Sequence, residues 1–286
     1  MLFSSRHPYL IGIDSDGCVF DSMEVKQVMH FHPLIIKHWS LRKIEPVLRE
    51  VAEYVNLRSP WRGSNRFIAL MKTFELLHEH PDARHPEVIL PGYADLADWV
   101  ESGETLSQDA LASRAKTSGE LKTVLDWSEA VNRDIAARML PVQPFDGAAD
   151  AVTLFHARAD VVVISLTPLE ALEHDWSTNG LRDCVDAIAG QEWGTKAEQI
   201  RLAISQGNYD PDHVLILGDA PGDLKAARET GVHFYPVIPG QETECWLRLL
   251  SADMDLFFRD AYKGKPELDR IGEFEAVLND PPPWKR

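Results

Sequence analysis

The pattern of apolar and polar positions divides the chain into a long helical stretch and a stretch in which strands and helices alternate. Residues 9–13 form a short continuous apolar run, which predicts a buried strand. From about residue 24 to residue 140, apolar residues recur every three or four positions. This spacing predicts that almost the whole of that stretch is helical.

After the segment LPVQPFDG the pattern changes to alternating strands and helices. Residues 161–165 and 214–217 are continuous apolar runs, and shorter strands are expected near 185–189 and 233–238. Continuous apolar strands that alternate with helices are typical of a parallel sheet covered on both faces. Residues 9–13 have the same character and are expected in the same sheet. The predicted fold class is therefore α/β, a doubly wound parallel-sheet core with an inserted all-helical domain.

The domain boundaries follow from this division. Residues 1–22 and 145–244 are predicted to form the α/β core, and residues 23–144 the helical insertion. Residues 245–286 are too apolar for a disordered tail, so we expect a C-terminal extension packed on the core. Its last residues, NDPPPWKR, are expected to be extended.

Composition narrows the class of protein. The chain has 286 residues, with 29 Lys and Arg against 45 Asp and Glu, a formal net charge of −16. This balance argues against nucleic acid as the main partner, whereas an anionic small substrate is compatible with a locally positive site. No apolar run is long enough to span a membrane, and we expect a cytoplasmic protein, either a monomer or a homodimer. The three cysteines are too few and too scattered for a disulfide framework or a zinc site.

Acidic, hydroxyl and amine side chains follow four of the predicted strands. They are Asp14, Asp16, Ser165, Lys196, Asp219 and Asp223. Ligands of open parallel sheets bind at the carboxyl ends of the strands, so we expect these groups to converge on one crevice. Four carboxylates this close together need a cation among them. Hard carboxylate oxygens at an open site favour Mg²⁺.

The order of these residues resembles the haloacid dehalogenase (HAD) superfamily, most of whose members are phosphohydrolases and phosphomutases. DSDGCVFDS, residues 14–22, resembles the nucleophile motif, and VVVIS, residues 161–165, resembles the second motif. Lys196 in GTKAEQI resembles the third motif, and LGDAPGD, residues 217–223, resembles the fourth. The resemblance covers residues 9–22 and 144 to about 240, and it points to the phosphatase and β-phosphoglucomutase-like branch.

The resemblance implies roles in phosphoryl transfer. Asp14 would attack phosphorus and form an aspartyl-phosphate, and Asp16 would protonate the leaving oxygen and later activate water. True dehalogenases of the superfamily lack an acid at the second position, so Asp16 points to phosphate esters. Ser165 would hydrogen-bond a phosphate oxygen. Thr167 is a competing hydroxyl, but the sequence explains it as the N-cap of the next helix.

The resemblance also implies a set of metal ligands. Mg²⁺ would bind the carboxylates of Asp14 and Asp219 and the backbone carbonyl of Asp16. Asp223 would be an outer ligand or the partner that orients Lys196. Lys196 itself would add positive charge at the equatorial phosphate oxygens.

The helical insertion resembles the cap that many members carry after the first motif, with Asp21 and Ser22 at the hinge. A cap closes over the site, excludes water and sets specificity. Within it, Arg58, Arg62 and Arg66 in NLRSPWRGSNRF are candidates for binding an anionic or ring-bearing substrate. Such arginines are also typical of a solvated, salt-bridged surface.

The sequence thus predicts a Mg²⁺-dependent phosphohydrolase of a small phosphorylated metabolite. A phosphomutase of the β-phosphoglucomutase type would use the same residues. A phosphonate hydrolase would need a cap lysine for a Schiff base, for which Lys26 and Lys72 are the nearest candidates. A binding or regulatory protein with an inactive site is the alternative from a different class.

Overall fold

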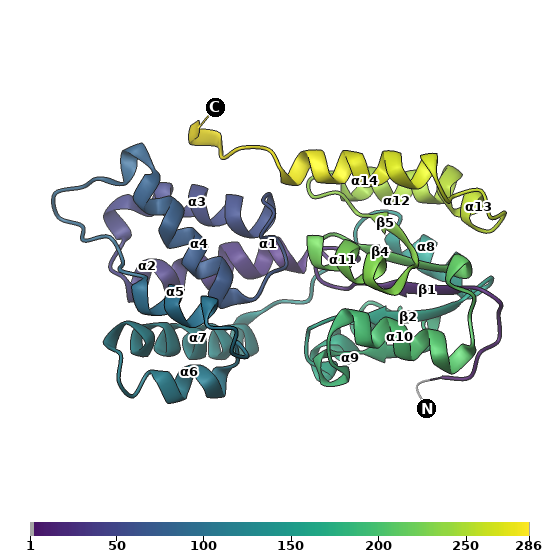
Figure 1. Cartoon of the computed structure of the whole chain (residues 1–286), viewed down its shortest axis with the longest axis horizontal. Helices are drawn as coiled ribbons and strands as arrows, with labels where there is room; N and C mark the ends of the chain where they lie inside the picture. Colours follow the sequence, from purple (N-terminus) through teal and green to yellow (C-terminus); the bar gives the residue numbers. More distant parts are fainter. Residues whose placement is uncertain (1–2, 286) are drawn as a thin grey trace. The chain divides into compact units, whose positions relative to one another are not determined.

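The computed structural model describes residues 3–285, and the chain folds into two compact units (Figure 1). An α/β unit contains Met1–Met23 and Pro141–Leu278, and a helical unit contains Glu24–Leu140 and Asn279–Arg286. The chain therefore passes from one unit to the other three times.

The α/β unit is built on one parallel sheet of five strands. The strands are β1 (Leu10–Ile13), β2 (Asp160–Ile164), β3 (Ala187–Ala189), β4 (Val214–Gly218) and β5 (His233–Pro236). Their order is β3-β2-β1-β4-β5, so the chain builds outward from β1 in one direction and then in the other. Because parallel crossovers are right-handed, this reversal places helices on both faces of the sheet. The predicted doubly wound α/β fold class is confirmed.

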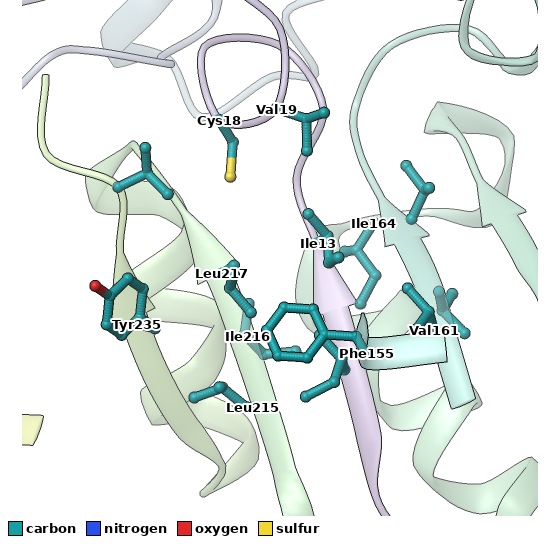
Figure 2. Packing of buried hydrophobic residues seen from close by; sticks show 14 of the residues in the cluster. Ile13, Cys18, Val19, Phe155, Val161, Ile164, Leu215, Ile216, Leu217 and Tyr235 are labelled. Atoms are coloured by element: carbon teal, nitrogen blue, oxygen red, sulfur yellow. The ribbon is translucent and has the colours of Figure 1, made fainter. Parts of the chain in front are cut away.

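Every residue of the five strands is buried, which explains their continuous apolar sequences. Gly12 has no side chain, and a Cβ there would lie 2.5 Å from Ile216 Cδ1 and 2.6 Å from Ile164 Cδ1. The isoleucines of the two neighbouring strands thus fill the space over the centre of β1. Phe155 joins the strand residues in this core (Figure 2).

Helices cover the sheet of the α/β unit. They are α8 (Ala148–His156), α9 (Leu169–Thr178), α10 (Lys196–Gly207), α11 (Pro221–Thr230), α12 (Glu242–Arg248), α13 (Met254–Phe257) and α14 (Lys265–Leu278). Thr195 and Glu198 form a capping box at the start of α10. Gly231, at φ +73°, ends α11 in the left-handed conformation.

In the described part of the helical unit there is no β-strand. Its helices are α1 (Ser22–Lys26), which starts at the boundary, α2 (His32–His38), α3 (Glu45–Leu57), α4 (Arg66–Glu79), α5 (Ala94–Glu101), α6 (Gln108–Arg114) and α7 (Gly119–Arg138). A π-helical turn, Gln27–Phe31, joins α1 to α2. Trp99 and Trp127 lie fully buried in a core separate from that of the α/β unit. No helix within residues 3–285 is both long and apolar enough to cross a membrane.

The C-terminal extension packs on the sheet only as far as the end of α14. Tyr262 donates a hydrogen bond to the carbonyl of Phe234 in β5 at 3.0 Å, and Phe274 of α14 packs on the Phe234 ring. Leu278 is the last residue of this α/β core.

The expectation that the whole of residues 245–286 packs on the core is wrong for its last eight residues, which group with the helical unit. The ring of Trp284 lies 5.7 Å from Tyr54 and 4.9 Å from His80, and Lys285 forms an ion pair with Glu79 at 2.5 Å. Three prolines follow Asp280, and Pro281 and Pro282 lie outside any helix. Pro283–Lys285 form a short 3₁₀ turn, so the expectation that NDPPPWKR is extended is wrong for these three residues.

His32, at the start of α2, is a buried histidine that resists protonation. Its side chain is fully buried, and within residues 3–285 neither ring nitrogen has a hydrogen-bond partner. Burial, assisted by the positive charge of Arg49, lowers its pKa to about 3. In the unfolded chain the same histidine takes up a proton below about pH 6.5. Its contribution to the free energy of unfolding is therefore lost as the pH falls from 6.5 towards 3.

We predict that His32→Leu removes this acid sensitivity. Below pH 6.5 the variant should lose less stability than the wild type, by up to about 1.4 kcal/mol per pH unit. Urea unfolding of both proteins at pH 4.5, 5.5 and 7.5 measures the difference. Parallel pH profiles for the two proteins would contradict the assignment.

Candidate active site

Asp14 is the first residue after the central strand. Its backbone N–H donates to the carbonyl of Leu217 at 3.0 Å, which continues the pairing of β1 with β4. The side chain is only 7% exposed, and its Oδ1 accepts a hydrogen bond from the N–H of Ser15 at 2.8 Å. The sheet therefore holds this carboxylate rigidly at the carboxyl end of β1.

Two buried tryptophans fix the turn that follows Asp14. Trp176 donates from Nε1 to Ser15 Oγ, and Trp246 donates from Nε1 to the carbonyl of Cys18, each at 3.0 Å. Gly17 has φ +79°, a left-handed conformation that glycine adopts without strain. These hydrogen bonds from the α/β core hold the turn in place, so the positions of Asp14 and Asp16 relative to each other are fixed.

Three buried carboxylates lie together at the ends of β1 and β4. Asp14, Asp219 and Asp223 each offer an oxygen within 4.8 Å of the other two. Burial raises the pKa of Asp14 to about 8; the nearby Asp223 and Asp219 add to the rise, and Lys196 opposes it. Buried oxygen ligands with excess negative charge fit a hard divalent cation such as Mg²⁺.

Lys196 supplies the positive charge of the site. Its Nζ lies 2.7 Å from Asp14 Oδ2 and also forms an ion pair with Asp223. Burial on its own lowers the pKa of this amine, but the attraction of Asp14 and Asp223 outweighs burial and raises it. Lys196 is therefore an ammonium ion at neutral pH.

Asp223 is held by the start of α11. Its Oδ2 accepts a hydrogen bond from the N–H of Ala220 at 3.0 Å. A Cβ at Gly218 would lie 2.4 Å from the Cβ and Cγ of Asp223, so only glycine at the end of β4 leaves room for this carboxylate. The fourth sequence motif thus has a packing role as well as a chemical one.

Two hydroxyl groups hold Asp16. Ser22 donates to Oδ1, and Thr167 donates to Oδ2 at 2.7 Å. The prediction that Thr167 serves as the N-cap of α9 is wrong, because the helix starts at Leu169 with Pro168 in the N-cap position. The Glu192 carboxylate accepts from the N–H of Leu169, which leaves the Thr167 hydroxyl to Asp16.

Ser165 lies directly after β2, beside the end of β1. It is buried, and its N–H donates to the carbonyl of Ala189 in β3 at 3.0 Å. Its Oγ accepts a hydrogen bond from the N–H of Thr167 at 3.3 Å. The Ser165 hydroxyl thus lies in the same loop as Thr167, whose hydroxyl donates to Asp16.

The three arginines of the helical unit have different surroundings. Arg58 is exposed, whereas Arg62 is buried and donates to the carbonyl of Leu57 at 2.9 Å. Arg66 donates to Asn132 Oδ1 at 2.7 Å, and its guanidinium lies 5.3 Å from the centre of the Phe31 ring. They do not share one environment, and their contact with substrate stays a prediction.

Comparison with known proteins finds one family that is similar to part of this chain. Residues 103–237 match the model of a family described as haloacid dehalogenase-like hydrolase. This region contains Ser165, Lys196, Asp219 and Asp223, and the sheet brings Asp14 of β1 to the same edge. A search of curated proteins found no match.

Several solved structures are similar in fold. A haloacid dehalogenase-like family hydrolase from Xanthomonas campestris is 11% identical, covers 92% of this chain and 100% of its own, and has a TM-score of 0.48. A haloacid dehalogenase-like family protein from Streptococcus pneumoniae is 16% identical, covers 84% and 90%, and has a TM-score of 0.46. A Bacillus subtilis protein described as a HAD hydrolase and bound to magnesium is 14% identical, covers 82% and 93%, and has a TM-score of 0.46.

The family match contains the second, third and fourth motifs, and the parallel sheet adds the two aspartates of the first. Residues 103–237 are therefore similar to the haloacid dehalogenase-like hydrolases, and β1 places Asp14 at the same edge of the sheet as the motifs of that region.

Proposed function

We propose that the protein is a Mg²⁺-dependent phosphohydrolase that acts on a small phosphorylated metabolite. The observation that carries the proposal is the arrangement at the end of β1. The buried Asp14 is paired with the Lys196 ammonium, and a second carboxylate two residues on, Asp16, is held by two hydroxyls. A nucleophile, a cation and an acid/base group are the parts that phosphoryl transfer through a covalent carboxylate needs.

The reaction has two steps. A carboxylate oxygen of Asp14 attacks phosphorus, the bond to the ester oxygen breaks, and the protonated Asp16 gives its proton to that leaving oxygen. The second step hydrolyses the aspartyl-phosphate. Asp16 takes a proton from water, the water oxygen attacks phosphorus, and Asp14 leaves as a carboxylate with inorganic phosphate as the product.

Lys196 and Ser165 would bind the phosphoryl oxygens. The carboxylates beside Lys196 keep it protonated, so it offers a full positive charge where negative charge develops. Ser165 lies at the end of β2, next to the strand that carries the nucleophile. Both groups belong to the α/β unit, so the phosphate site does not depend on the helical unit for its charge.

Asp14, Asp219 and Asp223 are the side chains that would hold Mg²⁺. When bound, the ion neutralises the repulsion between the nucleophile and the phosphate oxygens. Asp223 already pairs with Lys196 and with a backbone N–H, so we assign it to the outer part of the metal site and to the orientation of Lys196.

The helical unit is inserted directly after the first motif, and we propose that it acts as the cap that selects the substrate. Arg58, Arg62 and Arg66 are its candidate contacts. Lys72 pairs with Glu75 at 2.6 Å and lies 5.5 Å from the centre of the Trp61 ring. The Lys72 amine is thus already engaged with a carboxylate and a ring of its own unit, which does not favour Lys72 as the Schiff-base lysine of a phosphonate hydrolase.

Asp14→Asn should abolish turnover. The variant keeps the shape of the side chain and loses the nucleophile, so phosphate release should fall by at least about 10⁴-fold. A panel of phosphate esters, assayed with and without Mg²⁺, measures the release, and Asp183→Asn at an exposed position is the control. Equal release by wild type and Asp14→Asn would exclude hydrolysis through this residue and move phosphomutase or non-catalytic roles to first place.

Thr167→Val tests the hydrogen bond to Asp16. Valine keeps the β-branched shape but cannot donate, so kcat should fall at least about tenfold, since a hydrogen bond to a charged group contributes about 1.5–3 kcal/mol. Steady-state kinetics on the best ester give the value. Thr178→Val, at an exposed site on α9, should behave like the wild type. An unchanged kcat in Thr167→Val would remove the residue from the mechanism.

Mg²⁺ should stabilise the protein, and more so at high pH. Since the pKa of Asp14 is raised from 3.8 to about 8, the metal-free folded state keeps a proton that the unfolded chain releases. The free energy of unfolding of the metal-free protein therefore decreases as the pH rises from 3.8 to about 8, and Mg²⁺ competes with the proton for Asp14. At 100 times its Kd the ion should add about 2.7 kcal/mol.

Thermal unfolding with and without Mg²⁺ at pH 5.5 and pH 8 measures this effect. Asp219→Asn removes one carboxylate and should lose most of the gain from Mg²⁺. A wild-type melting temperature that does not change with Mg²⁺ at pH 8 would argue against the metal site.

A further inference from the structure

Gln199 lies buried on α10, one turn after Lys196, and is 1% exposed. Its Nε2 lies 3.0 Å from the carbonyl oxygen of Ser165, 3.0 Å from that of Gly190 and 3.1 Å from that of Gly194. Carbonyl oxygens only accept, so the side-chain NH₂ group must be the end that faces them. The two N–H groups of this amide are thus shared among three carbonyl oxygens.

These three carbonyls belong to the segments that carry the proposed phosphate-binding groups. Ser165 ends β2, Gly190 directly follows β3, and Gly194 directly precedes the capping box of α10. The helix that starts at Lys196 is therefore tied to the backbone of Ser165 through one side chain. One side-chain amide thus contacts all three segments.

The loop around Gly190 has little space in which to move. A Cβ at Gly190 would lie 2.8 Å from the backbone nitrogen of Leu169 and 2.9 Å from the carbonyl oxygen of Thr167. The N–H of Gln191 donates to the same Thr167 carbonyl at 3.1 Å. The loops after β2 and β3 thus pack directly on each other, and Gln199 bridges both to α10.

We propose that Gln199 is a positioning residue for the phosphate site. It sets the distance between the Lys196 ammonium and the Ser165 hydroxyl without touching the substrate. This inference rests on the proposed phosphohydrolase function. Catalytic groups need to be held within about 0.5 Å of their productive positions, and loss of the donor would remove the three hydrogen bonds through which Gln199 joins both loops to α10.

Gln199→Met tests the proposal, because methionine has nearly the same length and no N–H. With Mg²⁺ present, the inhibition constant of inorganic phosphate and the KM of the best ester should rise at least about tenfold. Mg²⁺ affinity, from the dependence of the melting temperature on Mg²⁺, should stay within about twofold. Asp14 and Asp219 directly follow β1 and β4, and the hydrogen bonds of Gln199 do not join these strands to α10.

The same helix offers a matched control. Gln206 lies two turns further along α10 and donates to the carbonyl of Phe3. Gln206→Met removes the same chemical group at a site away from the phosphate-binding loops. Its phosphate inhibition constant should match that of the wild type within about twofold.

Gln199→Glu provides a second test within one molecule. At pH 8 its carboxylate would face three carbonyl oxygens, whereas protonation at lower pH restores one O–H donor. The ratio of its phosphate inhibition constant to that of the wild type should therefore fall severalfold from pH 8 to pH 5.5. A residue needed only for packing would give a ratio that does not change with pH.

The outcomes separate this proposal from the function on which it rests. Phosphate binding by the wild type tests the proposed function, and its absence would overturn both inferences. The ratio of the phosphate inhibition constant of the Gln199 variant to that of the wild type tests the role of Gln199 alone. Wild-type phosphate binding in Gln199→Met, or a parallel loss of phosphate and Mg²⁺ affinity, would overturn the positioning role and leave the phosphohydrolase proposal intact.

Discussion

Three carboxylates and one ammonium group are buried together at the end of the central strand, and their charges do not cancel. Oxygen atoms of Asp14, Asp219 and Asp223 lie within 4.8 Å of one another, and the Lys196 ammonium pairs with Asp14 and Asp223. Burying a charge costs free energy unless an opposite charge pairs with it. The site therefore has an excess of negative charge, which a bound cation would neutralise. Burial is the main cause of the raised pKa of Asp14, and the neighbouring Asp223 and Asp219 add to it.

The surrounding structure keeps that arrangement from relaxing. Trp176 and Trp246 hold the turn after Asp14, and Gly218 leaves the only space in which Asp223 fits. These contacts lie in a core that is buried throughout the five strands, so the carboxylates cannot move apart without disturbing the sheet. A rigid support is what lets these like charges remain close to one another.

The sequence placed Asp14, Ser165 and Asp219 correctly, each directly after a buried strand, because continuous apolar runs mark such strands and the polar residue after each run is easy to recognise. Lys196 and Asp223 lie in the helices that follow β3 and β4. The side-chain partners were harder to predict. Thr167 precedes Pro168 and Glu170 in a pattern that also fits an N-cap, and only the three-dimensional structure shows that its hydroxyl reaches Asp16.

Long-range partners left no local signal at all. Trp284 follows three prolines, and nothing in that segment indicates Tyr54 or His80 as its neighbours. Gln199 is one polar residue in an ordinary helix, and its three carbonyl partners come from loops that periodicity does not place. Both contacts depend on the tertiary arrangement rather than on the spacing of residues.

The central position of β1 also has a consequence for how the chain reaches its fold. Leu10 pairs with Asp160 of β2 on one side and with Val214 of β4 on the other. β1 therefore has neither neighbouring strand until the ribosome has made β2 and then β4. Helices α2 to α7 make contacts closer in sequence and can form earlier. Asp14 is thus made before the strands that complete its surroundings, so the helical unit has time to fold while β1 is still unpaired.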